Sequence, residues 1–133
     1  MTLLNYTTQV EASKTVGQIH GILVAHGAKA ILTNYDEQGE IEALSFEVNT
    51  PRGIAHIKLP IDPEAVLRVM MRSDSRVPHR LKTRAQAVRI AWRIVKDWIE
   101  AQMAILETEM VKIEQIFLPY IETQSGRTLF EVF

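Results

Sequence analysis

The chain of 133 residues contains no cysteine. Its sequence therefore excludes disulfide bonds, thiolate nucleophiles and zinc sites that use cysteine ligands. No stretch approaches the roughly 18 uninterrupted apolar residues that mark a membrane-spanning helix. The first residues show neither the basic start nor the apolar segment of a secretory signal. We therefore expect a cytoplasmic protein.

Patterns typical of catalysis and of metal or cofactor binding are also missing. Lys14 and Thr15 resemble part of a phosphate-binding loop, but that loop needs glycines before the lysine and a strand before the glycines. The four histidines are not spaced with acidic residues in the way of metal ligands. Because no nucleophile–base pair can be assigned, the sequence favours a non-enzymatic protein, with no cofactor and no metal ion, over an enzyme.

Acidic residues are scarce in one part of the chain. Residues 68–96 contain nine bases and a single acid, Asp74. Residues 1–67 contain four bases and eight acids, and residues 97–133 contain two bases and seven acids. The net charge of −1 therefore conceals a strongly positive segment between two negative ones. Such an asymmetry within one domain indicates an anionic partner.

The longest regular stretch, residues 83–117, has no proline or glycine, and its apolar residues recur at helical spacing. Trp92 falls on the apolar side, so we expect it in the core. An unbroken helix of this length would span about 50 Å, which is more than a small sheet can cover. We therefore expect a break near residues 107–109. The apolar end of the chain, residues 108–133, is expected to join copies into a homo-oligomer.

Four shorter stretches predict strands. Residues 3–10 alternate and contain β-branched and aromatic side chains, which indicates an edge strand. Residues 29–35, 41–49 and 54–59 are separated by polar turns that contain glycine, which favours an antiparallel meander with one buried face.

Helix boundaries can be placed from capping residues. Ser13 or Thr15 is expected to cap a first helix, which would end at Gly27. Gly17 and Gly21, four residues apart, are expected to let a strand or another helix approach that helix closely. Residues 62–64, Asp-Pro-Glu, indicate the start of a second helix, and residues 83–86 form a capping box before the long stretch.

These elements predict an α+β fold in the order β-α-β-β-β-α-α, with an antiparallel sheet covered on one face by helices and a long C-terminal helical hairpin or kinked helix. We expect a single domain, residues 1–133. Its parts would be a sheet-rich region over residues 1–60, a helical region over residues 61–121 and a short apolar tail over residues 122–133.

The positive segment, which we call the basic belt, is rich in arginine. The planar guanidinium group pairs with phosphate through two hydrogen bonds and stacks on bases, which favours a surface that contacts a nucleic-acid backbone. The alternative is a solvated face that pairs with acids of the same chain, such as Asp97, Glu100 and Glu107. The belt comprises Arg68, Arg72, Arg76, Arg80, Lys82, Arg84, Arg89, Arg93 and Lys96, and all but Arg68 are candidate phosphate contacts.

Three functions therefore remain open. The leading hypothesis is an oligomeric protein that binds nucleic acid, preferably single-stranded, with Trp98 as a possible base-stacking residue. The second is a protein that binds or sequesters a nucleotide-type small molecule at a subunit interface. The third is a protein-interaction or inhibitor module whose belt docks on an acidic partner.

The helix–three-strand–helix order of residues 13–71 resembles that of double-stranded-RNA-binding domains, and a related core occurs in single-strand annealing proteins. The resemblance lies in the order of elements. The basic motif that begins the second helix of double-stranded-RNA-binding domains is replaced here by Asp62, Pro63 and Glu64. The whole chain also resembles small proteins of phage or prophage type, and that resemblance implies no function.

Overall fold

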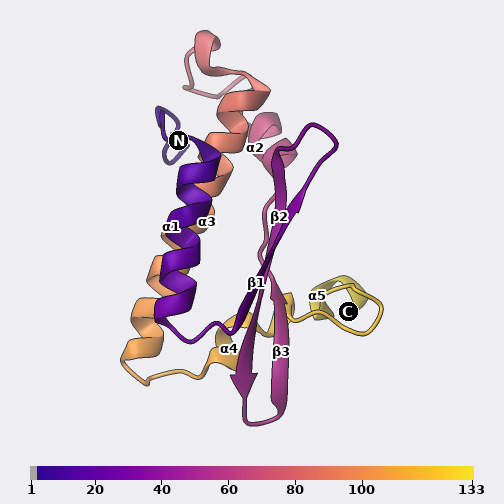
Figure 1. Cartoon of the computed structure of the whole chain (residues 1–133). Helices are drawn as coiled ribbons and strands as arrows, with labels where there is room; N and C mark the ends of the chain where they lie inside the picture. The colour runs from indigo at the N-terminus through magenta and orange to yellow at the C-terminus, as the bar shows by residue number, and fades with distance from the viewer. Residues whose placement is uncertain (1–2) are drawn as a thin grey trace.

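The computed structural model describes residues 3–133, and Figure 1 shows two long helices side by side along one face of a three-stranded sheet. The helices are α1 (Ala12–Ala25) and α3 (Arg84–Glu107). The strands β1 (Ala30–Tyr35), β2 (Ile41–Thr50) and β3 (Gly53–Lys58) are antiparallel and lie in the order β1-β2-β3. The predicted α+β fold with helices on one sheet face is confirmed.

Shorter helical elements connect the sheet to α3 and follow α3 in the chain. Helix α2 follows the sheet, one 3₁₀ turn precedes α3, and three short helical elements follow it. Their bounds are α2 (Pro63–Met70), the 3₁₀ turn η1 (His79–Leu81), α4 (Ile113–Phe117), the 3₁₀ turn η2 (Leu118–Tyr120) and α5 (Leu129–Val132).

The main core lies between the sheet and the two long helices. Alternate residues of β2, Leu44, Phe46 and Val48, are buried because successive side chains of a strand point to opposite faces. The helices contribute residues at helical spacing, and Trp92 is fully buried among them. The prediction that Trp92 is a core residue is therefore confirmed.

Three predicted helix boundaries are confirmed and one is wrong. The Asp62 carboxylate accepts a hydrogen bond from the Ala65 amide at 3.2 Å, and Thr83 Oγ1 accepts one from the Gln86 amide at 3.1 Å. Gly27, with φ +96°, ends α1. The expected caps Ser13 and Thr15 lie inside α1, because the helix begins just after Glu11. These expected caps are wrong.

The expected glycine contact in α1 is also wrong. Gly17 and Gly21 are exposed, and no other part of the described chain lies within 4 Å of the position that a Cβ would occupy. The face that α1 turns to the core is formed instead by Val16, Ile19 and Leu23. The two glycines therefore mark the side of α1 that faces solvent.

Residues 3–10 form turns and extended chain rather than the expected edge strand. Two backbone carbonyls of this segment bond to a side chain rather than to a neighbouring strand. Gln86 Nε2 donates to the carbonyls of Tyr6 and Thr8 at 2.9 Å each. Leu3 and Tyr6 pack against a second apolar cluster beside α2. Asn5 has φ +63°, which bends the chain out of a strand conformation.

The break expected near residues 107–109 is confirmed. Helix α3 ends at Glu107, and Glu109 adopts the left-handed conformation with φ +62°. The chain then turns back, so that Phe117 of α4 enters the core. Its ring meets those of Phe46 and Trp98 edge to face at centroid distances of 5.6 and 5.7 Å. The reversal therefore places a buried aromatic ring between β2 and α3.

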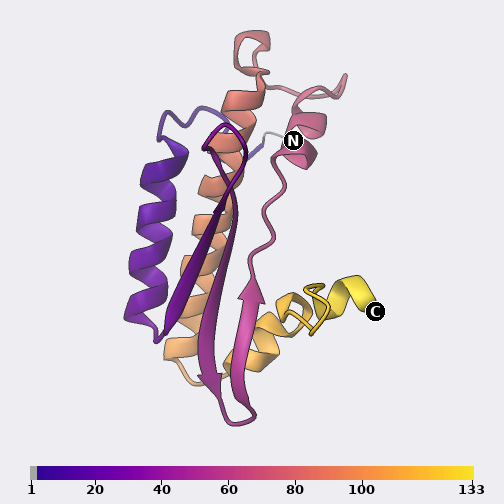
Figure 2. The same cartoon turned by 45° about the vertical axis from the view of Figure 1, so that its right-hand side comes forward.

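The C-terminal segment leaves the core along the edge of β3. Ile121 pairs with Ile57, and the Glu122 amide donates to the His56 carbonyl at 2.7 Å. Beyond this contact, α5 projects away from the helical layer (Figure 2). The last residues therefore lie outside the main core.

One contact joins the C-terminal ends of α1 and α3 and depends on pH. The imidazole of His26 lies 2.8 Å from the Ile22 carbonyl and 2.7 Å from Glu107 Oε1. The Ile22 carbonyl and then the Glu107 carboxylate raise the pKa of His26 above its ordinary value of 6.5, against a smaller opposing effect of burial. Both ring nitrogens donate when the ring is charged.

We expect the stabilisation from this contact to be complete below pH 6.5 and to be lost as the pH rises through the raised pKa of folded His26. Urea unfolding of the wild type and His26→Gln should therefore differ more at about pH 6 than at about pH 8. An equal difference at the two pH values would contradict the role of His26.

Candidate anion-binding surface

Helix α2, the following loop and the start of α3 form one end of the molecule. A second apolar cluster holds them together, with Met70, Val77, Ala87 and Ile90 buried. Figure 1 shows this end at the top, beside the N-terminal segment. The cluster fixes the elements that carry the first half of the basic belt.

The last two bases of the belt, Arg93 and Lys96 on α3, are engaged within the protein. Arg93 Nη1 donates to Gln18 Oε1 of α1 at 2.6 Å and lies 3.5 Å from Thr15 Oγ1. Lys96 pairs with Glu100 one turn later on α3. The alternative of pairing with acids of the same chain therefore applies to Lys96, while Arg93 joins α3 to α1.

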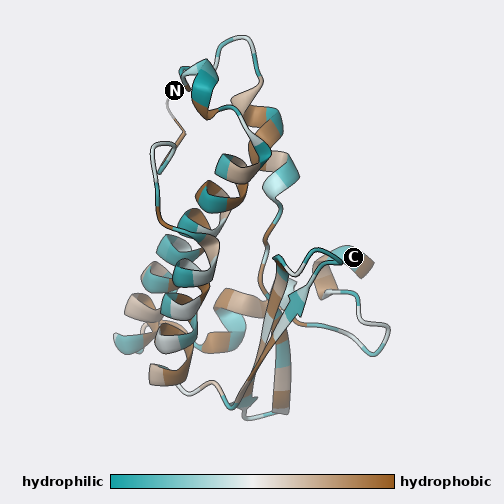
Figure 3. Ribbon diagram, turned by 45° about the horizontal axis from the view of Figure 1, so that its top comes forward, coloured by the Kyte–Doolittle hydropathy of each residue, from teal (hydrophilic) through white to brown (hydrophobic). Residues whose placement is uncertain are grey.

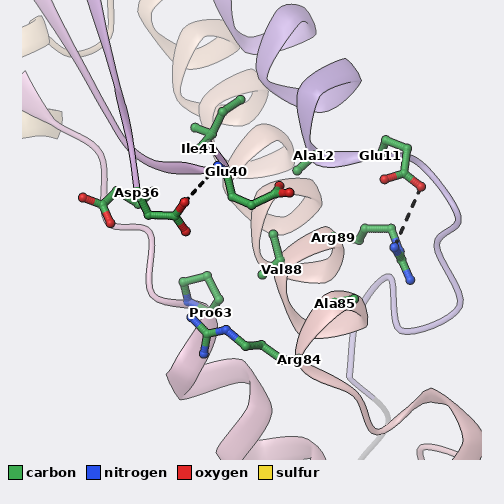
Figure 4. Close-up of a pocket in the computed structure, with 11 residues that line it drawn as sticks. Glu11, Ala12, Asp36, Glu40, Ile41, Pro63, Arg84, Ala85, Val88 and Arg89 are labelled. Carbon is green, nitrogen blue, oxygen red and sulfur yellow. Dashed lines mark hydrogen bonds and ion pairs between the residues drawn. The ribbon is translucent and has the colours of Figure 1, made fainter. Parts of the chain in front are cut away.

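Arg84, at the start of α3, pairs with Glu64 in the first turn of α2. Figure 4 shows Arg84 beside Pro63, in the wall of a depression of about 420 Å³. The wall of this depression also contains Arg89 and four acids. Because the acids outnumber the bases, this depression repels rather than attracts a phosphate. The four acids are Glu11, Asp36, Glu40 and Glu42.

Arg89 is held by a neutral partner. Its Nε donates to Gln86 Oε1 at 3.0 Å, and its Nη1 lies 3.8 Å from Glu11 Oε1. The side chain of Arg89 is 26% exposed and that of Glu11 is 73% exposed. An exposed ion pair at this distance contributes at most about 1 kcal/mol. The guanidinium group is thus oriented without being neutralised.

The remaining bases of the belt have no ion pair or side-chain hydrogen bond to any other residue of the described range 3–133. The four arginines are exposed and the lysine is half-buried. The single acid of the same stretch is Asp74. We call this set the basic end: Arg68, Arg72, Arg76, Arg80 and Lys82.

A second depression, of about 530 Å³, lies where the basic end meets the N-terminal segment. The sequence pattern did not indicate Thr7, Thr8 and Gln9 as wall residues, because it predicted a strand over residues 3–10. It also assigned Gln86 to a capping box, whereas the amide is 3% exposed and hydrogen-bonded to the N-terminal segment. The wall is formed by Thr7, Thr8, Gln9, Glu11, Arg80, Leu81, Gln86 and Arg89.

Trp98 lies away from this end. It is about 20 Å along α3 from Arg84, at 1.5 Å per residue. Its half-buried ring meets Phe117 and Tyr120 edge to face at centroid distances of 5.7 and 5.4 Å. The structure therefore does not bring Trp98 together with the basic end.

No protein-family model, curated protein or solved structure matches the chain. Within residues 3–133, no helix has the length and apolarity needed to cross a membrane. The same range contains no group of three His, Asp or Glu side chains placed to hold a metal ion. The basic end and the adjoining depression are the surface features of the described chain that suit an anionic partner.

Because Arg93 is bonded within the protein and Arg72 is not, substituting them should change the free energy of unfolding by different amounts. Arg93→Ala should lower the free energy of unfolding by about 1 kcal/mol, because it removes the hydrogen bond to Gln18. Arg72→Ala, at an exposed position, should change it by less than about 0.5 kcal/mol. Urea denaturation measures both, and equal effects would contradict the division.

Proposed function

We propose that the protein binds nucleic acid, preferably single-stranded, without catalysing a reaction, and that the basic end is the contact surface. The observation that carries the proposal is the set of five bases that have no partner within residues 3–133. A phosphate backbone supplies anions at regular spacing, and binding releases its condensed counterions. Arg93 and Lys96 belong to the packing of α3, and so they are not needed as contacts.

The preference for single strands is supported by the shape of the basic end. Its arginines project from the short helix α2 and from the loop after it, and the turn η1 carries Arg80. Such exposed guanidinium groups can pair with phosphates and stack on the unpaired bases of a single strand. The long helix α3 is buried along its core-facing side, so it offers little free surface to a duplex groove.

The contact surface is tested with an Arg72→Gln/Arg76→Gln double variant. Affinity for a fluorescent single-stranded oligonucleotide should fall, and the slope of log K against log salt concentration should become smaller by about 1.4, because each removed contact contributes about 0.7 for single strands. Fluorescence anisotropy across a salt series provides both values.

The matched control is Lys29→Gln/Arg52→Gln, which removes the same charge just before β1 and in the β2–β3 turn. Figure 1 shows this end of the sheet on the side away from α2. The control should leave the slope unchanged. Equal slopes for all three proteins, or no binding at low salt, would refute the proposal. Stabilisation by a mononucleotide without oligonucleotide binding would favour the small-molecule alternative, and a partner that survives nuclease treatment would favour the protein-interaction alternative.

We also propose that the protein assembles through its C-terminal segment. Met110, Leu118, Phe130, Val132 and Phe133 are exposed, and the Phe130 side chain is 72% exposed. Figure 3 shows the hydrophobic end of the segment lying apart from the core. Exposed aromatic side chains on one projecting segment favour burial against a second copy.

Replacing both aromatic residues, Phe130→Ser/Phe133→Ser, should convert an oligomer into a monomer, because most of the exposed apolar area of α5 is lost. Size-exclusion chromatography with light scattering measures the mass. A Leu4→Ser/Val24→Ser variant, altered at exposed apolar residues elsewhere, should keep the oligomer. A monomeric wild type at high concentration would contradict this part of the proposal.

A further inference from the structure

The depression of about 530 Å³ has two arginines in its wall, from different elements. Arg80 belongs to η1, is exposed and has no ion pair or side-chain hydrogen bond within residues 3–133. Arg89 comes from the second turn of α3. The N-terminal segment closes the other side with Thr7 and Thr8. We call this depression the Arg80–Arg89 pocket.

The orientation of Arg89 is fixed by a buried amide. Gln86 Nε2 donates to the carbonyls of Tyr6 and Thr8, which determines where Gln86 Oε1 points. That oxygen accepts from Arg89 Nε at 3.0 Å. A guanidinium group held by a neutral acceptor keeps its positive charge and loses little further freedom when an anion binds.

A carboxylate limits which anion can bind. Glu11 Oε1 lies 3.8 Å from Arg89 Nη1 and competes for that group. Glu11 precedes α1 and makes no side-chain capping hydrogen bond, so its side chain can move away. An incoming anion must be attracted more strongly than this carboxylate, and a phosphate monoester carries about 1.5 to 2 negative charges at neutral pH. A phosphodiester within a strand carries one.

A polar donor completes the wall. Thr8 Oγ1 accepts a hydrogen bond from the Val10 amide at 3.2 Å, which leaves the hydroxyl proton of Thr8 available to an acceptor. The two arginines and this hydroxyl therefore place donors from three parts of the chain in the wall of one depression.

We propose that the Arg80–Arg89 pocket binds a phosphate monoester and that its natural form is the phosphorylated end of a nucleic-acid strand. The inference rests on the proposed nucleic-acid binding, because Arg80 belongs to both the basic end and the pocket. The rest of the strand then follows Arg76 and Arg72, while the terminal phosphate sits between Arg80 and Arg89.

The test compares oligonucleotides of one sequence that end in a 5′-phosphate, a 3′-phosphate or hydroxyl groups only, with fluorescence anisotropy as the readout. One phosphorylated form should bind about tenfold more tightly than the hydroxyl form, as expected for a charge-assisted hydrogen-bonded contact. A nucleoside monophosphate is added as a competitor, and it should remove this preference without displacing the strand.

Three variants test the residues. Arg80→Gln should abolish the preference for the phosphorylated end. Arg89→Lys keeps the charge but loses the Nε contact with Gln86, so the preference should fall. Glu11→Gln removes the competing carboxylate and should strengthen binding of the phosphorylated end. Arg52→Gln, at the distant β2–β3 turn, is the matched control and should behave as the wild type. Circular dichroism confirms the fold of each variant.

Equal affinity for the phosphorylated and hydroxyl forms, or a preference that survives Arg80→Gln, would overturn the inference. In that case, binding of all forms through Arg72 and Arg76 would leave the proposed function standing. Binding of the nucleoside monophosphate in an Arg80-dependent manner, without binding of any oligonucleotide, would keep the pocket as a phosphomonoester site and would refute the nucleic-acid function.

Discussion

The burial of α3 against the sheet and α1 is the interaction on which the rest of the structure depends. Trp92 and Ile99 are fully buried on this helix, and the segments that precede and follow it in sequence pack against the same core. Because α3 is 24 residues long, it extends beyond the sheet and needs cover at both ends. Helix α2 covers its start, and Phe117 fills the core near its end.

The same packing determines which bases remain available. The polar strip of α3 faces α1, so Arg93 is used as a bond between the helices, and Lys96 pairs with Glu100. The bases on α2 and on the loop after it form no ion pair or side-chain hydrogen bond with any residue of the range 3–133. A belt that is continuous in sequence is therefore divided into a structural part on the later turns of α3, Arg93 and Lys96, and an available part at one end.

Gln86 links the fold to this available part. As a neutral and buried side chain, it holds the N-terminal segment by two carbonyls and also holds Arg89. The side-chain amide of Gln86 thus couples the position of the N-terminal segment to the orientation of Arg89, a candidate phosphate-binding residue. A polar side chain buried at this depth is tolerated because each of its bonding groups has a partner.

The antiparallel meander, the caps at Asp62 and Thr83 and the core position of Trp92 could be predicted from the sequence, because they follow from local periodicity and from hydrogen bonds between near neighbours. The sequence also located the positive segment. The long-range packing determines instead that residues 3–10 are not a strand, that Arg84 pairs with Glu64 and that Thr7 and Thr8 line one pocket with Arg80 and Arg89. These contacts join residues far apart in sequence, and which partners meet depends on how α3 packs, which no local pattern encodes.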